Sequence, residues 1–355
     1  LAFRDEVRAF LAEKLTPEIR RVGQLATSVY PDHEASMAWQ RILNERGWAA
    51  PHWPVEHGGC DWTMGQHYIF NRERIAAGAP SLSPMGIHMV AHVIIRFGTA
   101  AQKAYFLPRI LTGEIFFCQG YSEPGAGSDL AALTTRARPV DGGWRVNGTK
   151  LWTTYAHKAH AMLLLCRTGE GQRHEGLSQL LVPMDSPGLK LRPIIDLMGE
   201  HHFNEVHFDD VFVPADALVG AEGNGWAQVM SELAYERSGP ERFLSTLVLA
   251  EELVAALPED AVAAHAPIGR LAAHLMVLRL MARGMAALLE AGEDPALAEG
   301  HALAAEIAFG LALRAYDFTA HKSGDQRPRG PVALACAQPE TVAAAATPLA
   351  ALSEG

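Results

Sequence analysis

The feature that most constrains the fold of this chain is its hydrophobic period, which changes from helical to alternating and back again. In residues 1–115, apolar residues recur three and four positions apart, as in LAFRDEVRAFLAEKL, a spacing typical of one face of an α-helix. From 116 to 218 they alternate in short runs separated by turns, as in strands. From 219 to 355, long Ala- and Leu-rich segments restore the helical period. This order predicts an α+β fold with an N-terminal helical domain, a middle β domain and a C-terminal helical bundle.

The middle region has the texture of a small all-β unit. Its first two predicted strands, LTTRARP and GWRVNGTKLW, flank the turn VDGG, which is a hairpin signal. Four further apolar runs follow at short intervals: AMLLLCR, SQLLVPM, LKLRPII and NEVHFDDVFV. Several short strands at this spacing predict a small barrel or sandwich.

Charge and cysteine usage limit the class of partner. The formal net charge of −10 argues against nucleic acid, which calls for a clustered basic surface. No apolar run approaches the roughly 18–20 residues that cross a bilayer. The four cysteines are scattered without a C-x-x-C pair, which fits a reducing compartment better than a zinc site or disulfide framework. We therefore expect a soluble, cytoplasmic protein with no metal, nucleic acid or membrane partner.

The stretch CQGYSEPGAGSDL, residues 118–130, follows a plausible strand and gathers small residues in one loop. It lacks the third glycine of a dinucleotide fingerprint and the Gly-Lys-Ser/Thr of a P-loop. A plain surface turn is one interpretation. In the other, the small residues let backbone N–H groups approach an anion or ring heteroatom, and Ser122 and Ser128 add hydroxyls. Such a loop suits a planar, phosphate-bearing ligand such as a flavin.

A second motif, KLWTTY, lies some thirty residues downstream. Trp152 offers a flat apolar surface, and Thr153 and Thr154 offer hydrogen bonds. A tryptophan in the core of the β domain is the alternative interpretation of Trp152.

Together, YSEPGAGSDL and VNGTKLWTT resemble the flavin-binding core of the acyl-CoA dehydrogenase family, in which a Thr/Ser-Glu-Pro-Gly-x-Gly-Ser-Asp loop precedes a Trp-x-Thr. The resemblance extends over most of the chain. WPVEHGGCDWT is similar to the family's N-terminal loop, FGTAAQKAYFLPRILTGE to a later helix, and NEVHFDDVFVPADALVGAEGNGW to the exit from the β domain. These pieces occur in the family's order.

The resemblance implies FAD as the cofactor and an acyl-CoA thioester as the substrate. Ser122 would lie beside the flavin ring, and Ser128 would point towards the pantetheine arm of the substrate. Trp152 and Thr154 would pack on the ring and hydrogen-bond to it. The full set of residues implied to border the FAD is Gln119, Tyr121, Ser122, Gly127, Ser128, Trp152, Thr153 and Thr154.

The family's reaction removes the α-proton of the acyl group with a glutamate and passes a hydride to the flavin, giving a 2-enoyl-CoA. One family position for the base, near the C-terminus, has no counterpart in this sequence. The other, just before an arginine on the first helix after the β domain, is Glu236. Tyr235 and Arg237 would contact the substrate. Glu232 and Glu241 are neighbouring alternatives for the base, and a solvated Glu–Arg pair is the non-catalytic interpretation.

The sequence departs from the family in two elements that homotetrameric members use to complete a neighbour's FAD site: an Arg-x-x-Phe-Gly motif and a glycine-rich segment. This departure favours a heteromer with a related subunit, as in bacterial enzymes that act on bulky thioesters such as sterol side chains. A homo-oligomer remains open, and truncation would explain the loss of the second element. Electron-transfer flavoprotein is the implied electron acceptor. Two other classes stay open: a catalytically silent FAD- or CoA-binding partner subunit, and an oxidase or nitroalkane-type relative.

Histidines suggest no separate chemistry. His88 and His92 are four residues apart, but no glutamate follows His88, so the H-E-x-x-H metal pattern fails. We expect both in the core or in a pocket wall. His157 and His160 follow the tryptophan motif and are candidates to line the pocket.

Overall fold

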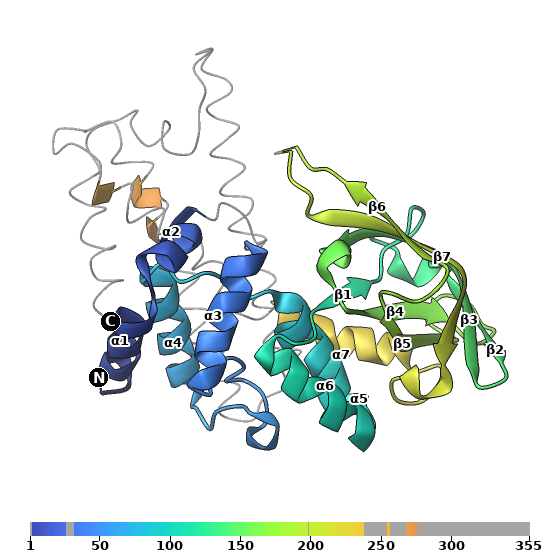
Figure 1. Ribbon diagram of the computed structural model, residues 1–355, viewed down its shortest axis with the longest axis horizontal. Helices are drawn as coiled ribbons and strands as arrows, with labels where there is room; N and C mark the ends of the chain where they lie inside the picture. The colour runs from blue at the N-terminus through green and yellow to red at the C-terminus, as the bar shows by residue number, and fades with distance from the viewer. Residues whose placement is uncertain are drawn as a thin grey trace, which may run out of the picture. The chain divides into compact units, whose positions relative to one another are not determined.

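The computed structural model describes residues 2–25, 32–197, 199–237, 254–255, 268–270, 272–273 and 276 (Figure 1). The chain divides into two compact units, which are treated separately below. One comprises Leu1–Leu25, Trp62–Ala79 and Arg237–Gly355, and the other comprises Ala26–Asp61 and Pro80–Glu236. Most of the predicted C-terminal helical bundle lies outside the described residues. Glu241 also lies outside them.

In the first unit, three helices lie within residues 1–115, the region that the sequence predicts as mainly helical. They are α1 (Ala2–Lys14), α2 (Pro17–Leu25) and α4 (Met64–Ala76). Helix α1 buries Val7, Phe10 and Leu11 on one face, which confirms the stripe seen in the sequence. An ion pair of 2.6 Å between Arg8 Nε and the buried Glu73 carboxylate joins α1 to α4.

Before the sheet, the second unit contains the helices α3 (His33–Glu45), α5 (Ala91–Phe97) and α6 (Ala100–Thr112), with a 3-10 turn η1 (Val55–His57) and a π-helical turn η2 (Met85–Val90). Helix α6 begins at a capping box, in which the Thr99 hydroxyl accepts from the Gln102 N–H and the Gln102 side chain accepts from the Thr99 N–H. It ends at Gly113, whose φ of 76° is favourable only for glycine. The predicted helix and its stop are thereby confirmed.

The middle of the chain forms one curled sheet, which has seven strands within the described residues (Figure 1). Its path runs β1-β4-β2-β3-β7-β6, and β5 pairs with β4. Strands β2 and β3 form the predicted hairpin. The bounds are β1 (Phe117–Gly120), β2 (Arg136–Val140), β3 (Gly143–Thr154), β4 (Ala161–Arg167), β5 (Leu177–Pro183), β6 (Leu189–Ile194) and β7 (Phe203–Pro214).

Burial in the sheet follows the sequence pattern. Strand β7 alternates buried and more exposed residues over much of its length, as expected for a strand with one solvated face. Strand β4 has six consecutive buried residues, as its continuous apolar run requires. Val146, Met162, Leu164, Val182 and Val206 belong to the core of the sheet. The predicted middle β domain is confirmed, in the form of a single curled sheet.

Helix α7 (Gly225–Arg237) follows β7 after the short turn η5 (Ala215–Ala217). Its Val229 is fully buried in a cluster with Leu165 of β4 and Leu177 of β5. A Cβ on Gly225 would lie 2.8 Å from the backbone of Leu177, so the helix starts in direct contact with β5. The first turns of helix α7 therefore pack against the sheet.

Within the described part of the chain, no helix combines the length and the apolar character that crossing a membrane requires.

Candidate functional site

The glycine-containing loop after β1 opens with a tight turn. The Glu123 N–H donates to the Ala126 carbonyl at 2.9 Å, and the Ala126 N–H donates back to the Glu123 carbonyl at 3.0 Å. Gly125 and Gly127 have φ values that any residue adopts, and a Cβ on either would meet nothing within 4 Å. The packing of the described chain therefore does not require glycine at these positions. Their bare backbone leaves room for a ligand to approach closely.

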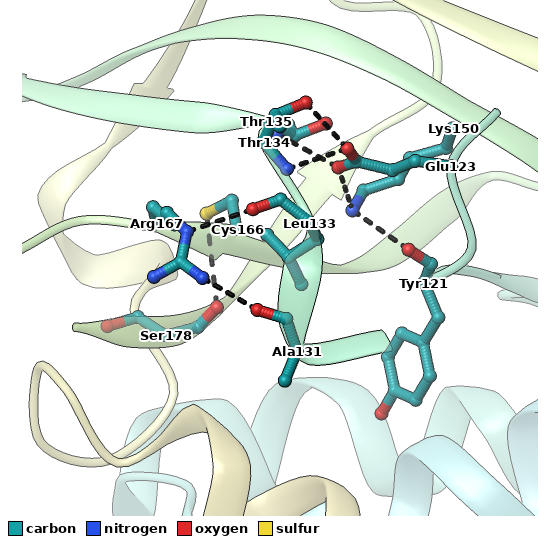
Figure 2. A network of polar contacts seen from close by, with 10 residues as sticks. All are labelled: Tyr121, Glu123, Ala131, Leu133, Thr134, Thr135, Lys150, Cys166, Arg167 and Ser178. Atoms are coloured by element: carbon teal, nitrogen blue, oxygen red, sulfur yellow. Dashed lines mark hydrogen bonds and ion pairs between the residues drawn. The ribbon is translucent and has the colours of Figure 1, made fainter. Parts of the chain in front are cut away.

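The loop is fixed to the sheet by a buried ion pair between Glu123 and Lys150 of β3 (Figure 2). The Lys150 side chain is fully buried, and its Nζ lies 2.9 Å from Glu123 Oε1. Glu123 also accepts from the N–H and hydroxyl of Thr134 at 2.7 and 2.8 Å and from the Thr135 N–H at 2.9 Å. Burial alone would raise the pKa of Glu123, but the Lys150 ammonium and these hydrogen bonds lower it to about 2.

The same lysine brings together the two motifs found in the sequence. Lys150 Nζ donates to the Tyr121 carbonyl at 3.0 Å, and the next residue, Leu151, donates its N–H to the Ser122 carbonyl at 2.8 Å. The loop that contains Ser122 and the strand that leads to Trp152 are thus joined backbone to backbone. Ser122 is half-buried and Ser128 is exposed, so the two serines of the loop differ in their exposure to solvent.

Trp152 is 56% exposed, which contradicts the alternative that it is a core tryptophan. Its φ of 58° lies in the left-handed region, which costs a non-glycine residue on the order of 1 kcal/mol or more. The residue stands where the pairing of β3 with β7 shifts register between Lys150 and Thr153. Phe203 meets its ring edge-on, with centroids 5.7 Å apart. A large flat side chain is therefore held outward at an energetic cost.

The two threonines after Trp152 differ in exposure. Thr153 is buried and its Oγ1 has no hydrogen-bond partner among the described residues, whereas Thr154 is half-buried. The Thr153 carbonyl accepts from Asn204 Nδ2 at 3.2 Å. An aromatic face, a buried hydroxyl without a partner and a bare loop backbone together fit a planar ligand that carries both donors and acceptors.

Gln119 and Tyr121 use their side-chain polar groups within the protein. Gln119 Nε2 donates to one oxygen of Glu232 on α7, and the Tyr121 hydroxyl donates to the other. Gln179 Nε2 of β5 in turn donates to the Tyr121 hydroxyl at 2.6 Å. Figure 2 shows the Tyr121 ring pointing away from the Glu123–Lys150 pair. The polar side-chain atoms of these two predicted ligand residues are therefore engaged within the protein.

The backbone of α7 places Tyr235, Glu236 and Arg237 in its last turn. Their side chains lie outside the described part of the structure, so the predicted base and substrate contacts stay predictions. Glu232, the alternative base, is fully buried and both of its oxygens are hydrogen-bonded. The Glu232 carboxylate is therefore engaged within the protein.

The histidines form two stacked groups that the sequence did not reveal. His52 stacks on His88 with centroids 4.7 Å apart, and it also meets His92 at 5.2 Å. Burial, together with nearby His88, lowers the pKa of His92 to about 4. Nowhere in the described residues do three or more His, Cys, Asp or Glu side chains gather in a way that could hold a metal ion.

The second group lies after Trp152, where His157 stacks on His201 at 3.8 Å. Asn204 hydrogen-bonds to both rings: its Nδ2 lies 3.1 Å from His157 Nδ1 and its Oδ1 lies 2.9 Å from His201 Nε2. His160 does not join this stack, because its Nδ1 accepts from the Phe116 N–H at 3.0 Å. Asn204 is a site residue that sequence reasoning missed, since only the β3–β7 register places it beside Thr153.

Comparison with known proteins agrees with this arrangement. The model of the acyl-CoA dehydrogenase N-terminal domain matches residues 1–114, and that of the acyl-CoA dehydrogenase middle domain matches residues 118–211. Acyl-CoA dehydrogenase IpdE1 of Mycobacterium tuberculosis is 41% identical over 275 residues, which is 76% of this chain and 71% of that protein.

Two solved structures are similar over nearly the whole chain. The ChsE4-ChsE5 complex from Mycobacterium tuberculosis matches with a TM-score of 0.72 and 31% identity, covering 100% of this chain and 92% of that one. The Tcur3481-Tcur3483 steroid ACAD matches with a TM-score of 0.74 and 28% identity, covering 99% and 92%. Both family models, the relative and the fold point the same way, and the resemblance seen in the sequence is confirmed: this chain belongs to the acyl-CoA dehydrogenase family.

Proposed function

We propose that this protein catalyses the FAD-dependent α,β-dehydrogenation of an acyl-CoA thioester to a 2-enoyl-CoA. Membership of the FAD-dependent acyl-CoA dehydrogenase family supports the reaction class. The observation that carries the proposal is the outward-held Trp152 beside a bare glycine loop, joined through Lys150. A strained tryptophan that is 56% exposed contributes little to the stability of the isolated fold, so contact with a planar ligand is the role proposed for it.

In this proposal the described residues hold the flavin in two ways. Trp152 packs against the ring, and Ser122, Thr153 and Thr154 supply hydrogen bonds around it. The backbone of Gln119, Tyr121 and Gly127 borders the cofactor, and Ser128 lies at the side where the thioester enters. Both Ser128 and Gly127 are exposed, as such contacts require.

Glu236 is the proposed base, and Tyr235 and Arg237 are the proposed substrate contacts. The α-proton of a thioester is weakly acidic, so the carboxylate needs a raised basicity that a dry pocket supplies. When bound, FAD supplies the hydride acceptor for the β-carbon. The chain's own task is to hold the thioester between the base and the flavin and to keep water out.

The direct test is the visible spectrum of the purified protein mixed anaerobically with a panel of acyl-CoA thioesters, from straight short chains to bulky sterol side chains. We expect the flavin absorbance to bleach with at least one of them. A protein that holds FAD but is bleached by none of the panel would contradict the proposed activity. Rapid reoxidation by oxygen would instead indicate an oxidase.

Trp152→Gly separates ligand binding from folding. Glycine adopts φ near 58° without strain and the side chain is mostly exposed, so we expect the free energy of unfolding to stay within about 1 kcal/mol of wild type. A buried tryptophan truncated in this way would lose about 3–5 kcal/mol. FAD affinity, measured by the recovery of flavin fluorescence on dilution, is expected to fall.

The matched control is Asp210→Gly, at an exposed residue of β7 with φ of 53°. It relieves the same backbone strain away from the site, and FAD affinity should be unchanged. Equal flavin retention in both variants would show that Trp152 does not contact the cofactor.

We further propose that the enzyme is a heteromer, with a related subunit completing the FAD site and electron-transfer flavoprotein accepting the electrons. The similarity to a ChsE4-ChsE5 complex and to the Tcur3481-Tcur3483 steroid ACAD supports this, as does the absence of the family's Arg-x-x-Phe-Gly motif from the segment after residue 237. Bulky acyl-CoA thioesters, including steroid ones, are then the substrates to try first. Expression alone and with the genomically adjacent relative tests the idea, since full FAD occupancy and activity of the chain alone would refute it.

A further inference from the structure

A buried carboxylate lies between α7 and the sheet, and the proposed chemistry does not use it. Glu232 is fully buried. Gln119 of β1 donates to its Oε1 and the Tyr121 hydroxyl donates to its Oε2. We propose that Glu232 is a positioning residue that ties the helix of the base to the loop of the flavin. This inference rests on the proposed function.

The hydrogen bonds of the network run in one direction, towards Glu232. Gln179 Nε2 donates to the Tyr121 hydroxyl at 2.6 Å, so the hydroxyl proton is directed at Glu232. The carboxylate accepts on both oxygens, from donors on β1 and on the loop that follows it. Charged acceptors make stronger and more directional hydrogen bonds than neutral ones. Glu232 therefore fixes the position of α7 relative to Tyr121, and its carboxylate has little freedom to rotate.

Anchoring α7 does not by itself require a charge. One turn earlier, Gln228 is also fully buried and donates its Nε2 to the Val219 carbonyl at 2.6 Å. A neutral amide is enough for that anchor. A buried carboxylate carries a larger desolvation cost and adds little net stability over an apolar side chain of similar size. The presence of the Glu232 carboxylate one turn later indicates that this position must do more than hold the helix: it must fix the position of α7 precisely.

One end of the hydrogen-bond network lies near the proposed base, Glu236, and the other lies near the proposed flavin-binding motif at Trp152. Glu236 follows Glu232 by four residues, which is about one turn or 6 Å along α7. At the other end, the Tyr121 carbonyl binds Lys150, and the neighbouring Ser122 carbonyl binds the Leu151 N–H, one residue before Trp152. Contacts of Glu232 thus span from the base helix to the flavin motif. A base and a hydride acceptor must be held to within about 1 Å of their working separation.

The test compares Glu232→Gln and Tyr121→Phe with Gln228→Leu, a buried change of similar size on the same helix. The protein is used with its partner subunit if the chain alone holds no FAD. At saturating acyl-CoA, we expect the rate of flavin reduction per bound FAD to fall about 10–100-fold in Glu232→Gln and by less in Tyr121→Phe. Gln228→Leu should lower the melting temperature and leave that rate near wild type.

A second readout does not depend on turnover. The visible circular dichroism of bound FAD reports the orientation and environment of the flavin ring. We expect this spectrum to change in Glu232→Gln and Tyr121→Phe but not in Gln228→Leu. The double variant should be no worse than Glu232→Gln alone, because both changes break one link. If Glu232→Gln does not fold, Tyr121→Phe carries the same comparison with one donor removed.

The outcomes separate this inference from the proposed function. A wild-type protein that binds FAD but is bleached by no acyl-CoA refutes the proposed activity, while the dichroism still decides the role of Glu232. Unchanged dichroism and an unchanged reduction rate in Glu232→Gln, with only a lower melting temperature, would overturn the inference and leave Glu232 as a plain structural anchor.

Discussion

Glu236→Gln is expected to stop flavin reduction by acyl-CoA while FAD stays bound. The amide has the shape of the carboxylate but cannot accept the α-proton. General-base catalysis contributes roughly 10²–10⁴-fold, so the anaerobic bleaching rate should fall by at least about 10²-fold. Exchange of the substrate's α-proton with deuterated solvent, followed by mass spectrometry, should cease in parallel. FAD content and the melting temperature should remain near wild type.

The control for this variant is Glu222→Gln. Glu222 is exposed in the segment before α7, so the substitution makes the same change in charge without removing the base. Bleaching by this variant should match wild type. If Glu236→Gln is reduced by acyl-CoA at the wild-type rate, another residue abstracts the proton. Glu241, which lies outside the described residues, would be tested next.

Lys150→Met is expected to give the largest loss of stability among the variants considered. It removes the ammonium from a fully buried ion pair and leaves the Glu123 carboxylate among groups that cannot neutralise it. Breaking a buried pair on one side typically costs about 3–5 kcal/mol. Glu123→Gln should be similarly harmful, because it leaves the lysine unpaired. Chemical denaturation followed by tryptophan fluorescence measures both, and the double variant should recover a large part of the loss.

An exposed ion pair supplies the comparison. Arg136 and Glu170 lie 3.1 Å apart, and the Glu170 side chain is 92% exposed. Glu170→Gln should leave the denaturation midpoint almost unchanged, since exposed pairs contribute little. A Lys150→Met protein as stable as Glu170→Gln would show that the buried pair does not hold the loop.

The pair also predicts how stability depends on acidity. The pKa of Glu123 is lowered from its ordinary 4.5 to about 2 in the folded protein. Its contribution to stability is therefore fully present above about pH 4.5 and is lost as the pH falls through about 2. Denaturation midpoints measured across this range should fall more steeply in wild type than in the Glu123→Gln/Lys150→Met protein, in which this titration is absent.

Local patterns predicted much of the fold. The Thr99 cap, the glycine stop at Gly113 and the hairpin turn at Asp141–Gly142 depend on residues close together in sequence, and the structure contains all three. The alternation of β7 likewise needs only its own residues. Such features could be predicted because neighbours along the chain determine them.

The supporting residues of the site could not be predicted in this way. Lys150 stands in a strand like any solvated lysine, and its burial depends on Glu123, which lies 27 residues away. The exposure and left-handed backbone of Trp152 depend on a register shift between β3 and β7. Glu232 has the same side chain as its neighbours Glu236 and Glu241, and its contacts with Gln119 and Tyr121 cannot be seen in the sequence. Each of these depends on contacts between distant segments.

The Glu123–Lys150 pair has a further consequence for how the site meets its cofactor. Several contacts that fix the loop come from the chain itself, among them those of the lysine, the Thr134 and Thr135 groups and the turn at Ala126. The conformational entropy of the loop is therefore lost when the domain folds, and not when the cofactor arrives. Association then requires no ordering step in this segment, and the affinity of the loop for the flavin reflects contacts alone. The site is preorganised.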